Sequence, residues 1–306
     1  MFSYRHAFHA GNHADVLKHT VLVAMLKHLT RKQTALTVVD THAGAGLYRL
    51  DGDYAGTSGE AADGVLKLFR ALKPGGKALP AIPAVAPALQ DYVDLVAAFN
   101  NSSRLKVYPG SPFVIQRLLR EEARDKLKLF ELHPTDIKSL VANVAQLQAG
   151  RQIAVAREDG FEGLKAFLPP PARRALVLID PSYEIKSDYP KVTACIQDCL
   201  KRFPTGSYAV WYPVIPRPEA HDVPRRLKTL ATQVDRPWLH ATLSIGQAQD
   251  RNVPGEPERG QGLTASGIFL INPPHTLKAA LLLALPQLLQ ILGRGKGQGQ
   301  SLEAGG

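Results

Sequence analysis

The chain has 306 residues, of which 45% are hydrophobic and 21% charged, so it has enough apolar material for one large domain with a substantial core. A formal net charge of +10 favours a polyanionic partner, nucleic acid before a membrane surface, and argues against small cationic substrates. The sequence has no apolar run of about 18 residues and no apolar start typical of a signal peptide. We therefore expect no membrane span and a cytoplasmic location.

The first regular element predicted is a helix over residues 14–29. Apolar side chains recur near helical spacing from Val16 to Leu29, and Asn12 or Gly11 is placed to cap its start. Several histidines precede or begin this helix, namely His6, His9, His13 and His19. His9 and His13 have i, i+4 spacing, but they lie in or beside a Gly-Asn turn rather than securely on a helix. We therefore expect no metal site, and a segment that faces solvent or RNA.

A short β-rich run over residues 34–39 ends at Asp40 and leads into the tight loop THAGAG. The pattern changes over residues 50–104, where helical stretches surround KPGGKALPAIPAVAPAL, a segment whose prolines and glycines exclude a central strand or a regular helix. We predict that residues 50–104 are a small helical insertion and that residues 1–49 and 105–292 form the core.

Further strand-like runs follow at residues 128–132, 153–157, 175–179, 208–212, 239–245 and 268–271. Helical segments lie between most of them, an alternation typical of a largely parallel, doubly wound sheet, so the predicted fold class is α/β. Only the loop GQAQDRNVPGEPERGQG separates the last two runs. We expect these two strands to pair antiparallel at the sheet edge, and their loop to border the substrate cleft. The Gly/Gln-rich tail, residues 293–306, is expected to be disordered.

Polar or glycine-rich sequence follows four of the predicted strands, at the edge where open α/β sheets bind ligands. The four segments are DTHAGAG from Asp40, ELH from Glu131, DG from Asp159 and DPSY from Asp180. Taken singly, an acid after a strand reads more simply as a helix cap. Several acids and a glycine loop at successive strand ends instead indicate a bound cofactor.

A nicotinamide dinucleotide is one candidate cofactor. The THAGAG loop supplies the first two glycines of the G-x-G-x-x-G fingerprint, but Arg49 stands in place of the third. Glu131 also lies far beyond the usual offset of about 20 residues. Both departures suit S-adenosylmethionine, which has no pyrophosphate to cradle. Its ribose diol would then meet Glu131, its adenine amine Asp159 and its methionine ammonium Asp40.

The sharpest chemical signal is the segment IDPSY at residues 179–183. An exocyclic adenine amine is a poor nucleophile because its lone pair is delocalised into the ring, so it needs acceptors for its two N–H groups. We expect the Asp180 carboxylate and the Pro181 carbonyl to supply them. We expect Tyr183 to stack on the base, a contact worth about 1–3 kcal/mol. Such a site acts by electrostatic preorganisation and positioning.

The tetrapeptide DPSY resembles the D/N-P-P-Y/F motif of amino-methyltransferases, with Ser182 in place of the second proline. The difference keeps the acidic side chain, the proline carbonyl and the aromatic ring of the motif. That motif also occurs in methyltransferases that act on DNA adenine, on guanine amines and on protein glutamine. It does not set the substrate by itself.

A series of motifs narrows the family. In chain order they are YRHAFHAGNHADVLKH, DTHAGAG, YPGSP, ELHP, EDGF, IDPSYE and WYPV. Over nearly the whole chain they resemble the bacterial 23S rRNA (adenine(2030)-N6)-methyltransferase family. The resemblance implies a Rossmann-like, S-adenosylmethionine-dependent methyltransferase core with an inserted helical subdomain. It also implies cofactor contacts from His19, His42, Ser111, Glu131, Asp159, Gly160 and Asp180.

The same resemblance implies roles around the substrate. Asp180 would be the proton acceptor or hydrogen-bond partner of the amine, Tyr4 would hold the RNA, and Lys18 would contact RNA or cofactor. The target adenine would leave its stack and enter a pocket between Tyr4 and Tyr183. The expected partner is 23S rRNA, naked or in an early assembly intermediate, and the expected state is a monomer.

Alternatives stay open at this point. A DNA adenine or protein-glutamine methyltransferase would carry the same DPSY-type motif. A non-catalytic RNA-binding assembly factor is a second alternative, although the intact acids at the strand ends argue against it. A nicotinamide oxidoreductase is opposed by Arg49. Ser111, taken from the sequence alone, could be only a helix cap.

Overall fold

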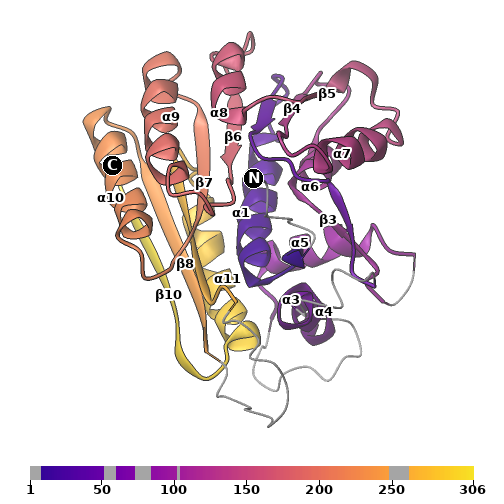
Figure 1. Cartoon of the computed structure of the whole chain (residues 1–306), viewed down its shortest axis with the longest axis vertical. Coiled ribbons are helices and arrows are strands. Elements are labelled where there is room, and N and C mark those ends of the chain that lie inside the picture. The colour runs from indigo at the N-terminus through magenta and orange to yellow at the C-terminus, as the bar shows by residue number, and fades with distance from the viewer. Residues whose placement is uncertain (1–7, 52–59, 73–83, 102–103, 248–261) are drawn as a thin grey trace.

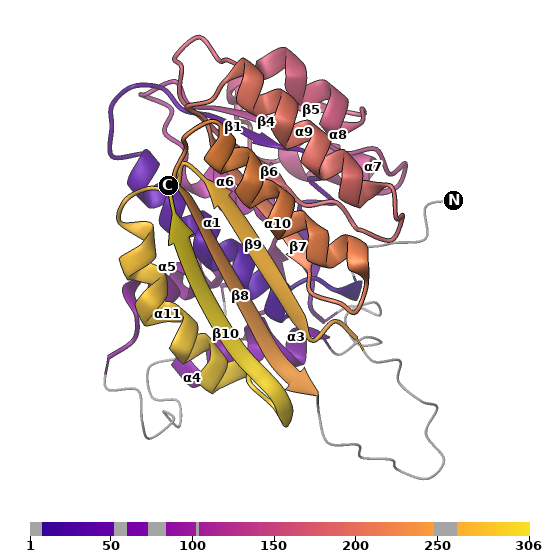
Figure 2. The ribbon, with the colours of Figure 1, turned by 90° about the vertical axis from the view of Figure 1, so that its left-hand side faces the viewer.

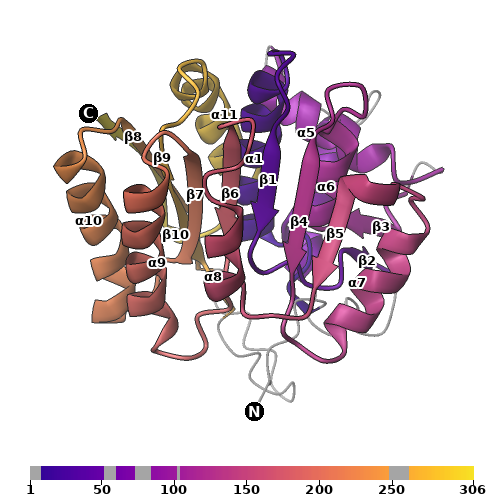
Figure 3. The ribbon, with the colours of Figure 1, turned by 90° about the horizontal axis from the view of Figure 1, so that it is seen from above.

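The computed structural model of the chain describes residues 8–51, 60–72, 84–101, 104–247 and 262–306. A mixed eight-stranded sheet has the order β10-β8-β9-β7-β6-β1-β4-β5, and β2 and β3 form a separate two-stranded sheet (Figures 1 and 3). The strands are β1 (Thr37–Asp40), β2 (Leu47–Arg49), β3 (Val107–Pro109), β4 (Lys126–Phe130), β5 (Ile153–Ala156), β6 (Ala175–Ile179), β7 (Ser207–Pro213), β8 (Trp238–Gln247), β9 (Ala265–Ile271) and β10 (Lys296–Gly305).

Helices connect most of these strands. They are α1 (His13–Leu29), α3 (Glu60–Asp63), α4 (Val65–Leu72), α5 (Pro87–Ala97), α6 (Ser111–Leu118), α7 (Asp136–Ala145), α8 (Gly160–Gly163), α9 (Asp188–Arg202), α10 (Pro218–Gln233) and α11 (Leu277–Leu292). Two short 3-10 helices, Gly150–Gln152 and Leu164–Phe167, complete the described elements. Within the described part of the chain, no helix is both long and apolar enough to cross a bilayer.

The strands β7, β6, β1, β4 and β5 run parallel, as the alternation of strands and helices predicted. Every residue of β6, sequence ALVLI, is buried, because helices cover both faces of the sheet. The remaining strands are antiparallel to their neighbours: β9 to β7, β8 to β9, and β10 to β8. The predicted α/β class is confirmed.

Two hydrophobic clusters fill the space on the two faces of the sheet. One contains apolar side chains of α1, α5, α6 and α11, and the other contains those of α8, α9 and α10. Figure 2 shows α9 and α10 on one side of the strands and α11 on the other. Asn12 caps α1 by accepting the backbone N–H groups of Ala14 and Asp15, one of the two caps that the sequence allowed.

The described helices between residues 60 and 101 are α3, α4 and α5, and α4 and α5 lie against α11. Their buried side chains, including Leu68 and Tyr92, belong to the same hydrophobic cluster as α1. Helices therefore do occupy the stretch between β2 and β3. The division into a core (1–49 and 105–292) and an insertion (50–104) stays a prediction.

The C-terminal tail is a strand, so the expectation of a disordered tail over residues 293–306 was wrong. β10 pairs in antiparallel register with β8 from Lys296 opposite Gln247 to Gly305 opposite Trp238. The glycines and glutamines of this strand carry no apolar pattern. The strand forms because its backbone pairs with the N–H and C=O groups along the otherwise open edge of β8. The predicted antiparallel pairing of β8 with β9 is confirmed. The pair was expected at the edge of the sheet, but β10 is the edge strand.

The turn before α1 is held by the start of α3. The Glu60 carboxylate contacts His9 Nδ1 at 2.9 Å and accepts a hydrogen bond from Asn12 Nδ2 at 3.0 Å. The Val65 N–H donates to the Gly11 carbonyl at 2.8 Å. The helices between β2 and β3 thus fix the position from which α1 starts.

Removing residues 296–306 tests the role of β10. We expect a loss of roughly 3 kcal/mol of unfolding free energy, since each ladder hydrogen bond contributes about 1 kcal/mol net and ordering entropy offsets part of the sum. A loss of that size lowers the melting temperature by about 5 °C, measurable by circular dichroism. An unchanged melting temperature would support the original expectation that this tail is disordered.

The His9–Glu60 pair predicts a pH-dependent contribution to stability. Its hydrogen bond to Glu60 raises the pKa of His9, against burial, so this contribution is present below the ordinary value of 6.5 and is lost as pH rises through the raised pKa. Burial raises the pKa of Glu60, but His9 lowers it by more, so the contribution present above 4.5 is lost as pH falls through the lowered pKa. The pair therefore stabilises most between these limits.

Urea unfolding of the wild type and of Glu60→Gln at a series of pH values measures this contribution. We expect the difference in unfolding free energy to peak near pH 5–6, at about 0.5 kcal/mol for a partly exposed pair, and to shrink on either side. A difference that does not vary with pH would contradict the ionic pairing.

Candidate active site

Four acidic residues follow four adjacent parallel strands. Asp40 ends β1, and Glu131, Asp159 and Asp180 come shortly after β4, β5 and β6. The register sets Asp40 opposite Leu129 of β4 and opposite Leu178 of β6. Because the strands β6-β1-β4-β5 are parallel neighbours, their carboxyl ends form one edge of the sheet (Figure 3). The four acids that follow separate strands in the sequence therefore lie at the same edge of the sheet, where open α/β sheets bind ligands.

Glu131 is tied to the glycine loop. Its Oε2 accepts the Gly44 N–H at 2.7 Å and its Oε1 accepts the His133 N–H at 2.7 Å. Burial raises the pKa of Glu131, and these two hydrogen bonds oppose the shift. Gly44 has φ +61°, and a Cβ there would lie 2.3 Å from the Tyr48 hydroxyl, so this turn requires glycine.

Asp40 is fully buried and engaged by its neighbours. Ser111 Oγ donates to Asp40 Oδ2 at 2.6 Å, and the His42 N–H donates to Oδ1 at 3.2 Å. Burial raises the pKa of Asp40 to about 6, although these hydrogen bonds lower it. Gly110 rather than Ser111 is the N-cap residue of α6, so the simple helix-cap interpretation of Ser111 was wrong.

The loops after β1 and β5 touch each other. His42 lies with its ring edge-on to Phe161, with 4.9 Å between ring centroids, and burial lowers the pKa of His42 to about 3. A Cβ on Gly160 would lie 2.0 Å from the Thr41 carbonyl oxygen, so only glycine permits this approach. Asp159 accepts the Phe161 N–H at 2.9 Å and thereby caps α8, as the simpler interpretation of that acid held.

His19 lies inside the protein on α1. Its Nδ1 is 2.7 Å from the Tyr108 hydroxyl, which is 3.1 Å from the Tyr92 hydroxyl of α5. The imidazole and Tyr108 rings stack, with 5.7 Å between centroids. The imidazole is thus oriented by residues on two other elements, β3 and α5.

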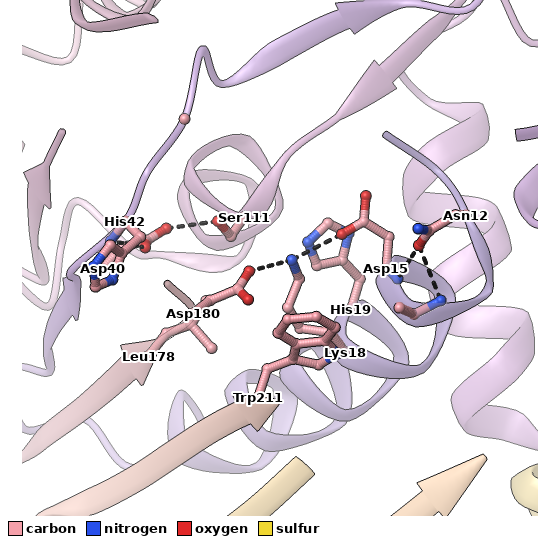
Figure 4. Close-up of polar contacts among 12 residues, drawn as sticks. Asn12, Asp15, Lys18, His19, Asp40, His42, Ser111, Leu178, Asp180 and Trp211 are labelled. Carbon is pink, nitrogen blue, oxygen red and sulfur yellow. Dashed lines mark hydrogen bonds and ion pairs between the residues drawn. The ribbon is translucent and has the colours of Figure 1, made fainter. Parts of the chain in front are cut away.

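Asp180 is paired with a buried lysine. Lys18 Nζ of α1 lies 2.5 Å from Asp180 Oδ2 and 2.8 Å from Asp15 Oδ1, and it sits 5.9 Å from the centroid of the Trp211 ring (Figure 4). Lys18 is only 4% exposed. The expected contact of Lys18 with RNA or cofactor stays a prediction, and its burial leaves little of the side chain for the RNA backbone.

The Tyr183 side chain packs inside the protein, against Tyr189 and Trp211. Its hydroxyl donates to the Trp211 carbonyl at 2.7 Å, and its ring lies 4.8 Å from the ring of Tyr189 and 6.0 Å from that of Trp211. The side chain is 2% exposed, and burial raises its pKa well above the ordinary value. This conformation leaves no exposed ring face for a base, in contrast to the stacking expected from the sequence. Pro181 is buried beside it.

Some predicted participants lie outside the described residues, namely Tyr4, His6 and most of the loop expected beside the cleft (248–261). Two residues near Asp180 were not selected from the sequence, Asp15 and Trp211. Asp15 stands three residues before Lys18, a spacing that sets both on one helix face, and this was the available signal. Trp211 belongs to the strand predicted over residues 208–212, and the sequence carried no separate signal for it.

Comparisons with known proteins identify the family of the chain. A sequence model of the family described as "Ribosomal RNA large subunit methyltransferase D, RlmJ" matches residues 33–302. The chain is 41% identical over 288 residues to the ribosomal RNA large subunit methyltransferase J of Escherichia coli (strain K12), covering 94% of this chain and 93% of the relative. Identity to the protein of the same name from Haemophilus influenzae is 38% over 293 residues, covering 95% and 94%.

A solved structure agrees as well. The crystal structure of protein LPL1258 from Legionella pneumophila str. Philadelphia 1 matches with a TM-score of 0.78 and 31% identity, covering 97% of this chain and 98% of that one. The family match spans most of the chain, and the curated relatives match over nearly their whole length. The chain belongs to the ribosomal RNA large subunit methyltransferase J family, as its motifs indicated.

Proposed function

We propose that this chain transfers a methyl group from S-adenosylmethionine to the N6 amine of an adenine in 23S rRNA, adenine 2030 by the resemblance of its motifs. The observation that carries the proposal is the position of Asp180. It follows β6 directly, beside the loop of β1, and its carboxylate is held by a buried ammonium. An acceptor fixed in this way suits an amine that must lose a proton.

The residues at the neighbouring strand ends fit the cofactor. Gly44 and Gly160 let the loops after β1 and β5 pack closely against Tyr48 and Thr41, which holds both loops at this edge of the sheet. Glu131 carries two oxygens suited to a ribose diol, and Asp159 follows the next strand. When bound, S-adenosylmethionine supplies a methyl group on a sulfonium, whose C–S bond breaks as the N–C bond forms.

The chain's own residues would act on the amine. The Asp180 carboxylate accepts one N–H and the Pro181 carbonyl the other, so that the nitrogen lone pair leaves conjugation with the ring and points at the methyl group. The nitrogen becomes cationic as the N–C bond forms, and the negative charge beside it stabilises that state. The proton then leaves the nitrogen through Asp180 to water.

The substrate proposal also rests on charge. A net charge of +10 suits RNA, whose phosphates supply sequence-independent affinity. We propose that the substrate is 23S rRNA, naked or in an early assembly intermediate, and that the chain acts as a monomer in the cytoplasm. DNA adenine and protein glutamine are the competing substrates, since the DPSY-type motif serves both.

Asp180→Ala tests the proposed chemistry. We expect methyl transfer at saturating S-adenosylmethionine to fall at least 100-fold, because the amine loses its charged acceptor. The measurement is transfer from radiolabelled S-adenosylmethionine to protein-free 23S rRNA, with digestion to identify N6-methyladenine. Asp198→Asn, which breaks an exposed pair with Arg202, is the matched control and should behave as wild type. Near-normal activity of Asp180→Ala would remove the role of Asp180, and label on DNA or protein in place of RNA would replace the substrate.

Glu131→Gln tests the cofactor end. A carboxylate accepts both the Gly44 and His133 N–H groups, whereas a glutamine must turn its amide NH2 toward one of these donors. We expect the Kd for S-adenosylmethionine, measured by calorimetry, to rise about 10–100-fold, because the proposed ribose diol loses a charged acceptor, worth about 1.5–3 kcal/mol. A Kd equal to that of the wild type would exclude Glu131 from the cofactor site.

A further inference from the structure

Asp15 is the second carboxylate of a cluster of three residues, Asp15, Lys18 and Asp180, of which the first two are buried. One turn apart on α1, Asp15 and Lys18 contact each other at 2.8 Å, and the same Lys18 Nζ reaches Asp180 at 2.5 Å (Figure 4). The side chains of Asp15 and Lys18 are 2% and 5% exposed. A carboxylate is rarely buried this deeply without a partner, and here it has been set beside an ammonium that the reaction centre also uses.

The Asp15 carboxylate is fixed from its other side too. Its Oδ2 accepts the Gly11 N–H at 2.9 Å, while its own backbone N–H donates to the Asn12 cap at 3.0 Å. With one oxygen on Gly11 and the other on Lys18, the carboxylate holds the ammonium at a defined point. Lys18 has a flexible side chain of four methylenes, so without Asp15 its ammonium could move fully onto the Asp180 carboxylate.

The charges of the cluster explain why a second carboxylate helps. Burial lowers the pKa of Lys18, but Asp15 and Asp180 raise it by more, so the side chain stays an ammonium. With both carboxylates ionised the cluster carries one net negative charge. Without Asp15, Lys18 would neutralise Asp180 and compete with the adenine amine for its oxygens.

We infer that Asp15 is a positioning residue for the proposed methyl transfer. It shares Lys18 with Asp180, so that Asp180 keeps an oxygen for the amine and the cluster keeps a negative charge toward the nitrogen as it becomes cationic. The inference rests on the proposed function. Asp15 acts through Lys18 and does not itself contact the substrate.

Two substitutions separate charge from packing. Asp15→Asn keeps the size of the side chain and an acceptor for Gly11 but removes the charge, whereas Asp15→Glu keeps the charge and adds a buried methylene. We expect kcat on protein-free 23S rRNA to fall about 10–100-fold in Asp15→Asn, with KM for S-adenosylmethionine changed less than about threefold. We expect Asp15→Glu to recover a large part of the lost kcat.

A purely structural role would give the reverse order, because the isosteric asparagine would be tolerated and the larger glutamate would not. That order, or a full kcat in Asp15→Asn, overturns the inference. Calorimetric titration with S-adenosylmethionine counts the folded, binding-competent fraction of each variant, so kcat is stated per competent molecule. The control is Asp91→Asn on α5, which removes the ion pair with Lys27 on α1, the helix that carries Asp15. This variant should leave kcat unchanged.

The two proposals fail in different ways. Wild-type chain that binds S-adenosylmethionine and places no label on RNA rejects the proposed function, and the role of Asp15 with it. Wild-type chain that labels RNA, together with an Asp15→Asn variant that does so at full kcat, rejects Asp15 alone.

Discussion

The buried ammonium of Lys18 is the contact on which the reaction centre depends. It joins helix α1 to the end of strand β6, two elements that come from opposite ends of the first two hundred residues. Taking such a charge out of water costs several kcal/mol per ion, and only well-placed counter-charges offset that cost. An ion pair of this kind is weak evidence for stability. It is better understood as the means by which the position of Asp180 is specified relative to α1.

The parallel sheet supplies the rest of the site. Because β6, β1, β4 and β5 are neighbours with the same direction, one acid after each strand is enough to build an acidic edge. The stretch between β1 and β4 does not interrupt this edge, because β2 and β3 within it pair with each other in a separate small sheet. The close contacts at Gly44 and Gly160 hold the loops after β1 and β5 against Tyr48 and Thr41.

Features that depend on residues close together in the chain could be predicted from the sequence. The apolar run 175–179 coincides with β6, and the acids after the strands followed from their order along the chain. Three features were beyond it. β10 has a composition that suggests disorder, and its strand state depends on the open edge of β8. The pairing of Lys18 with Asp180 spans 162 positions and depends on how α1 packs. The covered ring of Tyr183 depends on Tyr189 and Trp211.

The turn before α1 links the helices between β2 and β3 to the chemistry. Glu60 holds His9 and Asn12, the Val65 N–H holds the Gly11 carbonyl, and the Gly11 N–H in turn holds Asp15. The two polar groups of Gly11 thus face a neighbouring helix and the buried cluster respectively. A shift of that turn would move the Asp15 carboxylate and the ammonium it shares with Asp180. The helices between β2 and β3 therefore help to define the geometry at Asp180.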